Sequence, residues 1–166
     1  MLRKLTALML LSTPAFAGWN VDSSHMLSTV MIDDGVMLQH RMQSAVSPFE
    51  AGPQLEISLG TSLIRQRFSQ PHAGRYALGL RQELGQDYSV SVRAVTIDQD
   101  LGPIGPLLHS TRLGMEAAID WRIWTAPPIG THIPIGLNLV GYAGTIPDAG
   151  RPLTWAGTGI ALAFGR

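Results

Sequence analysis

Apolar and polar residues alternate along most of this sequence with a period of two. From residue 54 to residue 64, every second residue is Leu, Ile or Thr, and those between are mostly Glu, Ser or Gly. Successive side chains of a β-strand point to opposite faces, so the pattern predicts strands with one apolar and one polar face. Frequent glycines and prolines separate these stretches, as turns require. The chain is therefore predicted to be all-β.

Eight strands are expected between these breaks. No connection is long enough for a crossover helix, so neighbouring strands should pair antiparallel. Asp33-Asp34-Gly35 and Leu84-Gly85-Gln86 are expected to form tight turns with the glycine in the left-handed conformation. The strands are predicted at residues 24–32, 36–45, 54–64, 75–84, 87–97, 110–123, 132–143 and 154–165.

The charged residues within strands two to six all fall on the polar faces. Arginine and carboxylates pair well in a confined space, where an unpaired charge would cost several kcal/mol. We therefore interpret them as a paired structural filling of a barrel lumen, with a proton path or an anion site as alternatives. By the same alternation, Tyr142 and Trp155 fall on the polar faces of their strands. The charged set is Arg41, Glu56, Arg75, Arg81, Glu83, Arg93, Arg112, Glu116, Asp120 and Arg122.

Two architectures accommodate such two-faced strands. A soluble barrel places the apolar face inside, as a periplasmic barrel binding an apolar ligand would. A membrane barrel turns it out to lipid and keeps the polar face in its lumen. The small residues between the charges suit a narrow filled lumen, and the strand lengths suit a tilted membrane crossing. Connections at 65–74, 98–109 and 145–152 are mostly longer than those at 46–53, 84–86 and 125–130. The sequence predicts an eight-stranded antiparallel up-and-down transmembrane β-barrel.

The first seventeen residues have the features of a secretory signal peptide. Arg3 and Lys4 precede an apolar run, and Ala15-Phe16-Ala17 is a small-x-small cleavage site. We expect residues 1–17 to be removed on export and residues 18–166 to form a single barrel domain. The apolar run is too short to anchor the chain as a membrane helix.

Composition excludes several classes of protein. Loss of Arg3 and Lys4 would leave ten basic residues against twelve acidic ones, a net charge near −2. A basic nucleic-acid binder is therefore not expected. The chain has no cysteine, which excludes disulfides and thiolate chemistry. No cofactor and no metal site are expected, because no two of the five histidines have the usual ligand spacing.

The signal peptide, the eight two-faced strands and the terminal segment Ile160-Ala161-Leu162-Ala163-Phe164 together resemble the small eight-stranded outer-membrane proteins of the OmpA-barrel, OmpX and NspA kind. In that class the last residue is usually an aromatic read by the barrel-assembly machinery; here Gly165 and Arg166 follow Phe164. The resemblance implies an outer-membrane location in a Gram-negative bacterium. It also implies outer-membrane lipid and the assembly machinery as partners, and a structural or surface-interaction role towards an unidentified external ligand.

A lipid-active barrel enzyme is the alternative function. The lipid A deacylases are similar in length and strand number and carry a His-x-Ser-Asn motif on the penultimate strand. The matching segment here, Asn138-Leu139-Val140-Gly141-Tyr142, has neither the histidine nor the serine. His109 and Ser110 are adjacent and would point to opposite faces, which disfavours activation of the serine. A loop site built from His72, His109 and Asp98 or Asp100 stays open as an alternative, so no catalytic residue is assigned and an enzyme is not expected.

Overall fold

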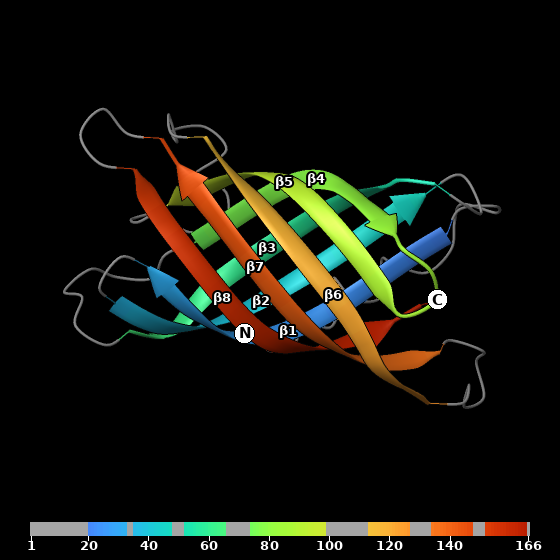
Figure 1. The fold of residues 1–166 in the computed structure, drawn as a ribbon. Helices are drawn as coiled ribbons and strands as arrows, with labels where there is room; N and C mark the ends of the chain where they lie inside the picture. The colour runs from blue at the N-terminus through green and yellow to red at the C-terminus, as the bar shows by residue number, and fades with distance from the viewer. Residues whose placement is uncertain are drawn as a thin grey trace, which may run out of the picture.

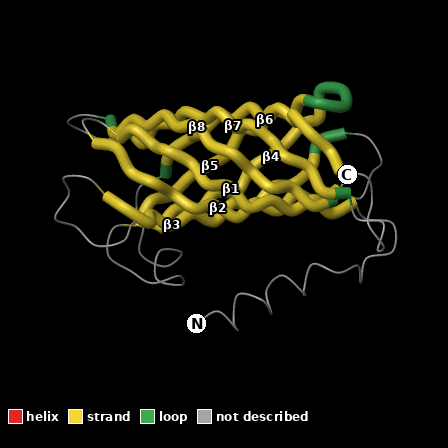
Figure 2. Tube along the Cα trace, turned by 90° about the horizontal axis from the view of Figure 1, so that it is seen from below, coloured by secondary structure: helices red, strands yellow, loops and turns green. Residues whose placement is uncertain are grey.

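The structure is a computed structural model that describes residues 20–32, 35–47, 52–65, 74–98, 113–126, 134–147 and 152–165. These residues form eight antiparallel strands, each paired with its neighbour in sequence, and β8 pairs with β1 to close the barrel (Figures 1 and 2). No helix among the described residues is long and apolar enough to cross a membrane. The strands are β1 (Asn20–Ile32), β2 (Gly35–Ser47), β3 (Gln54–Arg65), β4 (Gly74–Glu83), β5 (Tyr88–Asp98), β6 (Gly114–Ala126), β7 (Ile135–Ile146) and β8 (Leu153–Phe164).

The two ends of the barrel are distinguished by their connections. At one end, named here the C-terminal end, lie the start of β1, the end of β8 and the turn between β4 and β5 (Figure 1). At the opposite end, β1 is joined to β2, and the longest connection, residues 99–113, joins β5 to β6. The longest connection thus lies at the end opposite the termini, as the sequence pattern predicts. The others do not separate by end: connections of six and eight residues occur at both ends, and the shortest, residues 33 and 34, lies at the opposite end.

The faces are arranged as a membrane barrel requires. Leu78, Leu80 and Met115 are 54%, 58% and 62% exposed on the outside, whereas Arg41 and Glu116 are 0% and 1% exposed inside. The described side chains of the outer face include no Asp, Glu, Lys or Arg. This arrangement is the opposite of a soluble barrel that encloses an apolar ligand, and it confirms the predicted fold class.

Most predicted strands agree with the structure to within three residues, with two larger differences. β1 begins at Asn20, four residues before the predicted start, and its inward side chains include Asp22 and Met26. β6 begins at Gly114 and continues to Ala126, because a register shift between Arg122 and Trp124 lets the strand bend and continue.

The two predicted turns have different outcomes. Gly85 has a φ of 85°, so the left-handed glycine between β4 and β5 is confirmed. Gly35 pairs with Ile32 as the first residue of β2, so the predicted three-residue loop was wrong and the connection contains only residues 33 and 34. With a two-residue connection, the hydrogen-bonded pairing of β1 and β2 extends to the residues that flank the turn, and Gly35 is then part of the strand.

Candidate functional site: the charged lumen

One carboxylate, Glu116 of β6, lies at the centre of a buried ionic cluster. Its Oε1 accepts hydrogen bonds from Arg41 Nη1 at 3.1 Å, from Arg93 Nη1 at 2.9 Å and from Arg75 Nη2. Its Oε2 accepts from Trp155 Nε1 at 2.8 Å and from Arg41 Nη2 at 3.4 Å. The side chain of Glu116 is fully buried, so these donors replace water entirely.

A second carboxylate extends the cluster towards the C-terminal end. Glu56 Oε1 lies 2.7 Å from Arg93 Nη2, and Glu56 Oε2 accepts a hydrogen bond from Ser91 Oγ at 2.7 Å. Arg93 therefore bridges the two acids. Neutral side chains complete the outer contacts: Arg75 Nη1 donates to Ser58 Oγ at 3.1 Å and Arg41 Nε donates to Gln39 Oε1 at 2.6 Å.

The cluster forms because closure of the barrel brings distant segments together. Arg41 comes from β2, Arg75 from β4, Arg93 from β5, Glu116 from β6 and Trp155 from β8. Each residue has inward parity on its own strand, so no loop is needed to position it. Five of the eight strands thus meet at one buried ionic group across the lumen.

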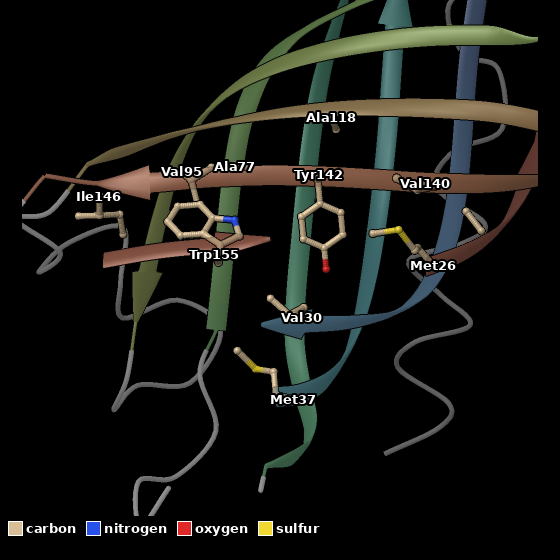
Figure 3. Packing of buried hydrophobic residues seen from close by; sticks show 11 residues of the cluster. Met26, Val30, Met37, Ala77, Val95, Ala118, Val140, Tyr142, Ile146 and Trp155 are labelled. Carbon is tan, nitrogen blue, oxygen red and sulfur yellow. The ribbon is translucent and has the colours of Figure 1, made fainter. Parts of the chain in front are cut away.

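Two aromatic residues line the lumen beside the cluster (Figure 3). The Arg41 guanidinium carbon lies 3.5 Å from the Tyr142 ring centroid, a cation–π contact. The Tyr142 hydroxyl donates to Ser28 Oγ at 2.8 Å on the other side of the β8–β1 closure. Polar functions of Tyr and Trp need partners when buried, and both Tyr142 and Trp155 have one here.

Glycines on the neighbouring strand make room for these two rings. Tyr142 is paired with Gly157, and Trp155 is paired with Gly144, so the β7–β8 pair contains two reciprocal aromatic–glycine pairs. A Cβ added at either glycine would overlap the opposing ring. The glycines are therefore required by close approach of the rings.

A cavity lies between the ionic cluster and the C-terminal end of the barrel. This cavity, named here the vestibule, has a volume of about 370 Å³ and includes Arg81, Glu83, Asp120 and Arg122 among its lining residues. Arg81 Nε donates to Ser89 Oγ at 3.0 Å, and Gln54 Nε2 donates to Glu83 Oε1 at 3.4 Å. The lining carries both signs of charge, so it presents no concentrated anion or cation site.

The ten charged residues predicted for the polar face therefore separate into groups. Arg41, Glu56, Arg75, Arg93 and Glu116 form the buried cluster, and Asp120 is 6% exposed at the border of the vestibule. Arg81, Glu83 and Arg122 are half-buried and line the vestibule. Arg112 lies outside the described residues.

The neutral partners were not identified from the sequence. Gln39, Ser58 and Ser91 form hydrogen bonds with the charged groups. In the sequence, only their position on the polar face of a strand that also carries a charge could have indicated this. Tyr142 and Trp155 had the same signal, and the structure places both rings inside. The choice of partners depends on how the strands are staggered around the closed barrel, which the alternation alone does not specify.

The cluster is suited to bracing the wall rather than to chemistry. A general base needs a free lone pair that a reactant can reach, whereas Glu116 is saturated with donors and sealed from solvent. Within the described residues no group of three or more His, Cys, Asp or Glu side chains could hold a metal ion. His72, His109, Ser110 and Asp100, and the side chain of Asp98, fall outside what the structure describes.

Comparison with known proteins supports the fold. No family model matches the sequence, and no curated protein matches it. The structure is similar to that of Neisserial surface protein A, with a TM-score of 0.53 and 8% identity over 90% of this chain and 98% of that one. Two other solved structures are more distant. They are the N-terminal barrel of Pseudomonas aeruginosa OprF (TM-score 0.49, 9% identity, 86% and 97% covered) and the designed protein TMB2.3 (0.43, 9%, 88% and 95%).

Neisserial surface protein A is an outer-membrane barrel, and the likeness to it is one of fold. The strand number, the antiparallel order and the closure between β8 and β1 are those that the sequence predicts. The chain therefore has the fold of the small eight-stranded outer-membrane barrels, and the resemblance inferred from its sequence is confirmed.

Proposed function

We propose that this protein is an outer-membrane barrel that serves as a structural or surface-interaction element of the bacterial envelope. The observation that carries the proposal is the inversion of its two faces. Its outside is a largely apolar wall, which water would not tolerate on a soluble monomer, and its inside is a sealed ionic cluster. Lipid is the solvent in which both faces are satisfied.

The partners follow from that proposal. Lipid acyl chains would cover positions of the apolar wall such as Ile57, Leu78 and Ile119, which are 50%, 54% and 51% exposed. The barrel-assembly machinery would insert the exported chain. A surface-interaction role would use the connections at the end opposite the termini, most of whose residues lie outside the described part of the chain.

The test is fractionation of cells that express the full chain. We expect the protein in the outer-membrane fraction, and we expect the unboiled sample to migrate faster on a gel than the boiled one, because a closed barrel stays compact until heated. Recovery in the soluble periplasm without detergent would contradict the proposal.

A further inference from the structure

Two histidines lie side by side on the outer face of the barrel. His25 of β1 and His40 of β2 are both half-buried, and His25 Nδ1 lies 3.4 Å from His40 Nε2. Their ring centroids are 5.6 Å apart and the ring planes differ by 21°. The facing nitrogens lie closer together than the ring centroids do. These are also the only two histidines in the part of the chain that the structure describes.

This placement is unusual for polar groups on an apolar wall. Polar side chains at lipid-facing positions are costly, and they mark functional sites more often than structural ones. The lumen cluster cannot satisfy the two imidazoles, because both have outward parity. Their neighbours are mostly apolar: Leu27 is paired to His40, Leu162 is paired to His25, and the Phe164 ring is edge-on to His25, while Thr61 is the partner of His40 on β3.

A third donor, of a second type, occupies the adjacent outward position. Met42 is the cross-strand partner of His25 and lies two residues after His40 on the same face of β2. Directly opposed residues on one face have Cβ atoms about 4.5–5.5 Å apart, within reach of a long flexible side chain. One thioether and two imidazoles are thus held on two neighbouring strands.

The nitrogen separation is that of a long hydrogen bond between the two rings, and it also leaves room for an ion between them. Good protein hydrogen bonds span roughly 2.7–3.2 Å, so the 3.4 Å separation is long for one. Two metal–nitrogen bonds of about 2.0–2.1 Å across that gap subtend about 110° at the ion, which is close to tetrahedral. Both imidazoles would bind as neutral rings, each with its remaining N–H on the nitrogen that faces away from the ion.

We propose that His25, His40 and Met42 form an external binding site for a copper ion, with Cu(I) preferred. Thioether ligands select Cu(I), and imidazole also suits it, whereas Zn(II) gains little from a thioether. The site lies in the half of β1 nearer the C-terminal end. There β8 ends at Phe164, two residues beyond the His25 partner Leu162, while β1 and β2 pair for five further positions, to Asn20 and Ser47.

The test uses the full chain folded in detergent micelles, with His72, His109 and His132 replaced by glutamine so that no other imidazole competes. Cu(I) affinity is measured under anaerobic conditions by competition with a chromophoric chelator, and the ligands are identified by X-ray absorption. We expect one Cu(I) per chain with two nitrogen ligands and one sulfur ligand. If Cu(I) bound to the form with the three glutamine substitutions did not have two nitrogen ligands, the proposal would be overturned.

Variants at the site and away from it separate the proposal from adventitious binding. His25→Phe and His40→Phe keep an aromatic ring on the lipid face. Each should weaken Cu(I) binding at least about tenfold, since even the loss of a group that hydrogen-bonds to a metal ligand costs that much. Met42→Leu should weaken Cu(I) binding and remove the sulfur signal. Met115→Leu, on the outward face of β6, should leave both unchanged. Equal binding by the histidine variants, or an equal effect of Met115→Leu, would overturn the site, and the gel-mobility shift verifies that each variant is folded.

Discussion

At the residue scale, Glu116 is the group on which most of the buried charge depends. Three guanidinium groups and the Trp155 indole donate to it. Two of those arginines, Arg41 and Arg75, form no ion pair with another described acid among the contacts within 4 Å. Removing one partner of a buried pair leaves the other charge uncompensated.

Glu116→Leu is therefore expected to lower the free energy of unfolding by about 3–5 kcal/mol. Asp87→Ala, at an exposed position in the β4–β5 turn, is the control and should change it by less than about 0.5 kcal/mol. Urea unfolding in detergent, followed by tryptophan fluorescence, measures both. Equal effects of the two substitutions would show that Glu116 does not hold the cluster.

The aromatic–glycine pairs give a second prediction at this scale. A Cβ at Gly144 would overlap the Trp155 ring and would lie 2.7 Å from the Met115 carbonyl oxygen, so Gly144→Ala must displace the indole from Glu116. We expect a loss of about 1–3 kcal/mol, as overpacking generally costs. Gly141 is on the same strand but faces outward, and its Cβ would meet only Ile119 at 3.7 Å. Gly141→Ala should unfold at nearly the parent urea concentration, and a matching loss would show that strand propensity, not ring packing, is measured.

At the scale of the strand, the alternation of side chains makes the two faces separately testable. Leu78 in the middle of β4 and Leu84 in the following turn are equally exposed, at 54% each. In water, arginine would be tolerated at either position. In a bilayer, Leu78→Arg should cost about 2–4 kcal/mol if it lies near the midplane, and Leu84→Arg should cost about 0–1 kcal/mol at the rim. Unfolding of the two variants from lipid vesicles measures the difference, and equal stability would contradict a membrane-facing wall.

The same alternation explains how much of the structure could be predicted from the sequence. Parity placed Arg41, Glu116 and even Trp155 correctly, because each strand has only two faces. It did not anticipate the register shift near Arg122, which leaves Ile123 and Trp124 both exposed, at 41% and 54%. A bulge depends on local pairing with β7, and the period of one strand contains no information about it.

The site was predicted less completely than the strands. The sequence assigned the ten charges to one face. Their division into a sealed cluster and an open vestibule depends on the position of each residue along the barrel axis, called its height here. Height depends on the stagger of all eight strands together. The contact of His25 with His40 has the same origin, since it depends on the register in which β1 and β2 pair.

At the scale of the whole molecule, the cluster closes the space between the walls. Side chains from five strands meet at Glu116, and an eight-stranded barrel leaves little room beyond its own side chains. We expect the folded protein to show no steady conductance in planar bilayers under conditions in which a large porin conducts. Discrete, long-lived conductance steps from the purified parent protein would contradict a sealed lumen.

The long reach of the contacts that meet at Glu116 has a consequence for the order of events during folding. Arg41 and Glu116 are 75 residues apart in sequence, and Tyr142 and Ser28 are 114 residues apart. Such contacts carry a large loop-closure cost, and the one between Tyr142 of β7 and Ser28 of β1 forms only when the barrel closes. Until β2 and β6 face each other across the lumen, Arg41 must remain hydrated, so the inner wall of a partly inserted chain stays wet. The ionic cluster therefore forms after the rate-limiting step of folding. It lowers the unfolding rate of the finished barrel and leaves the folding rate unchanged.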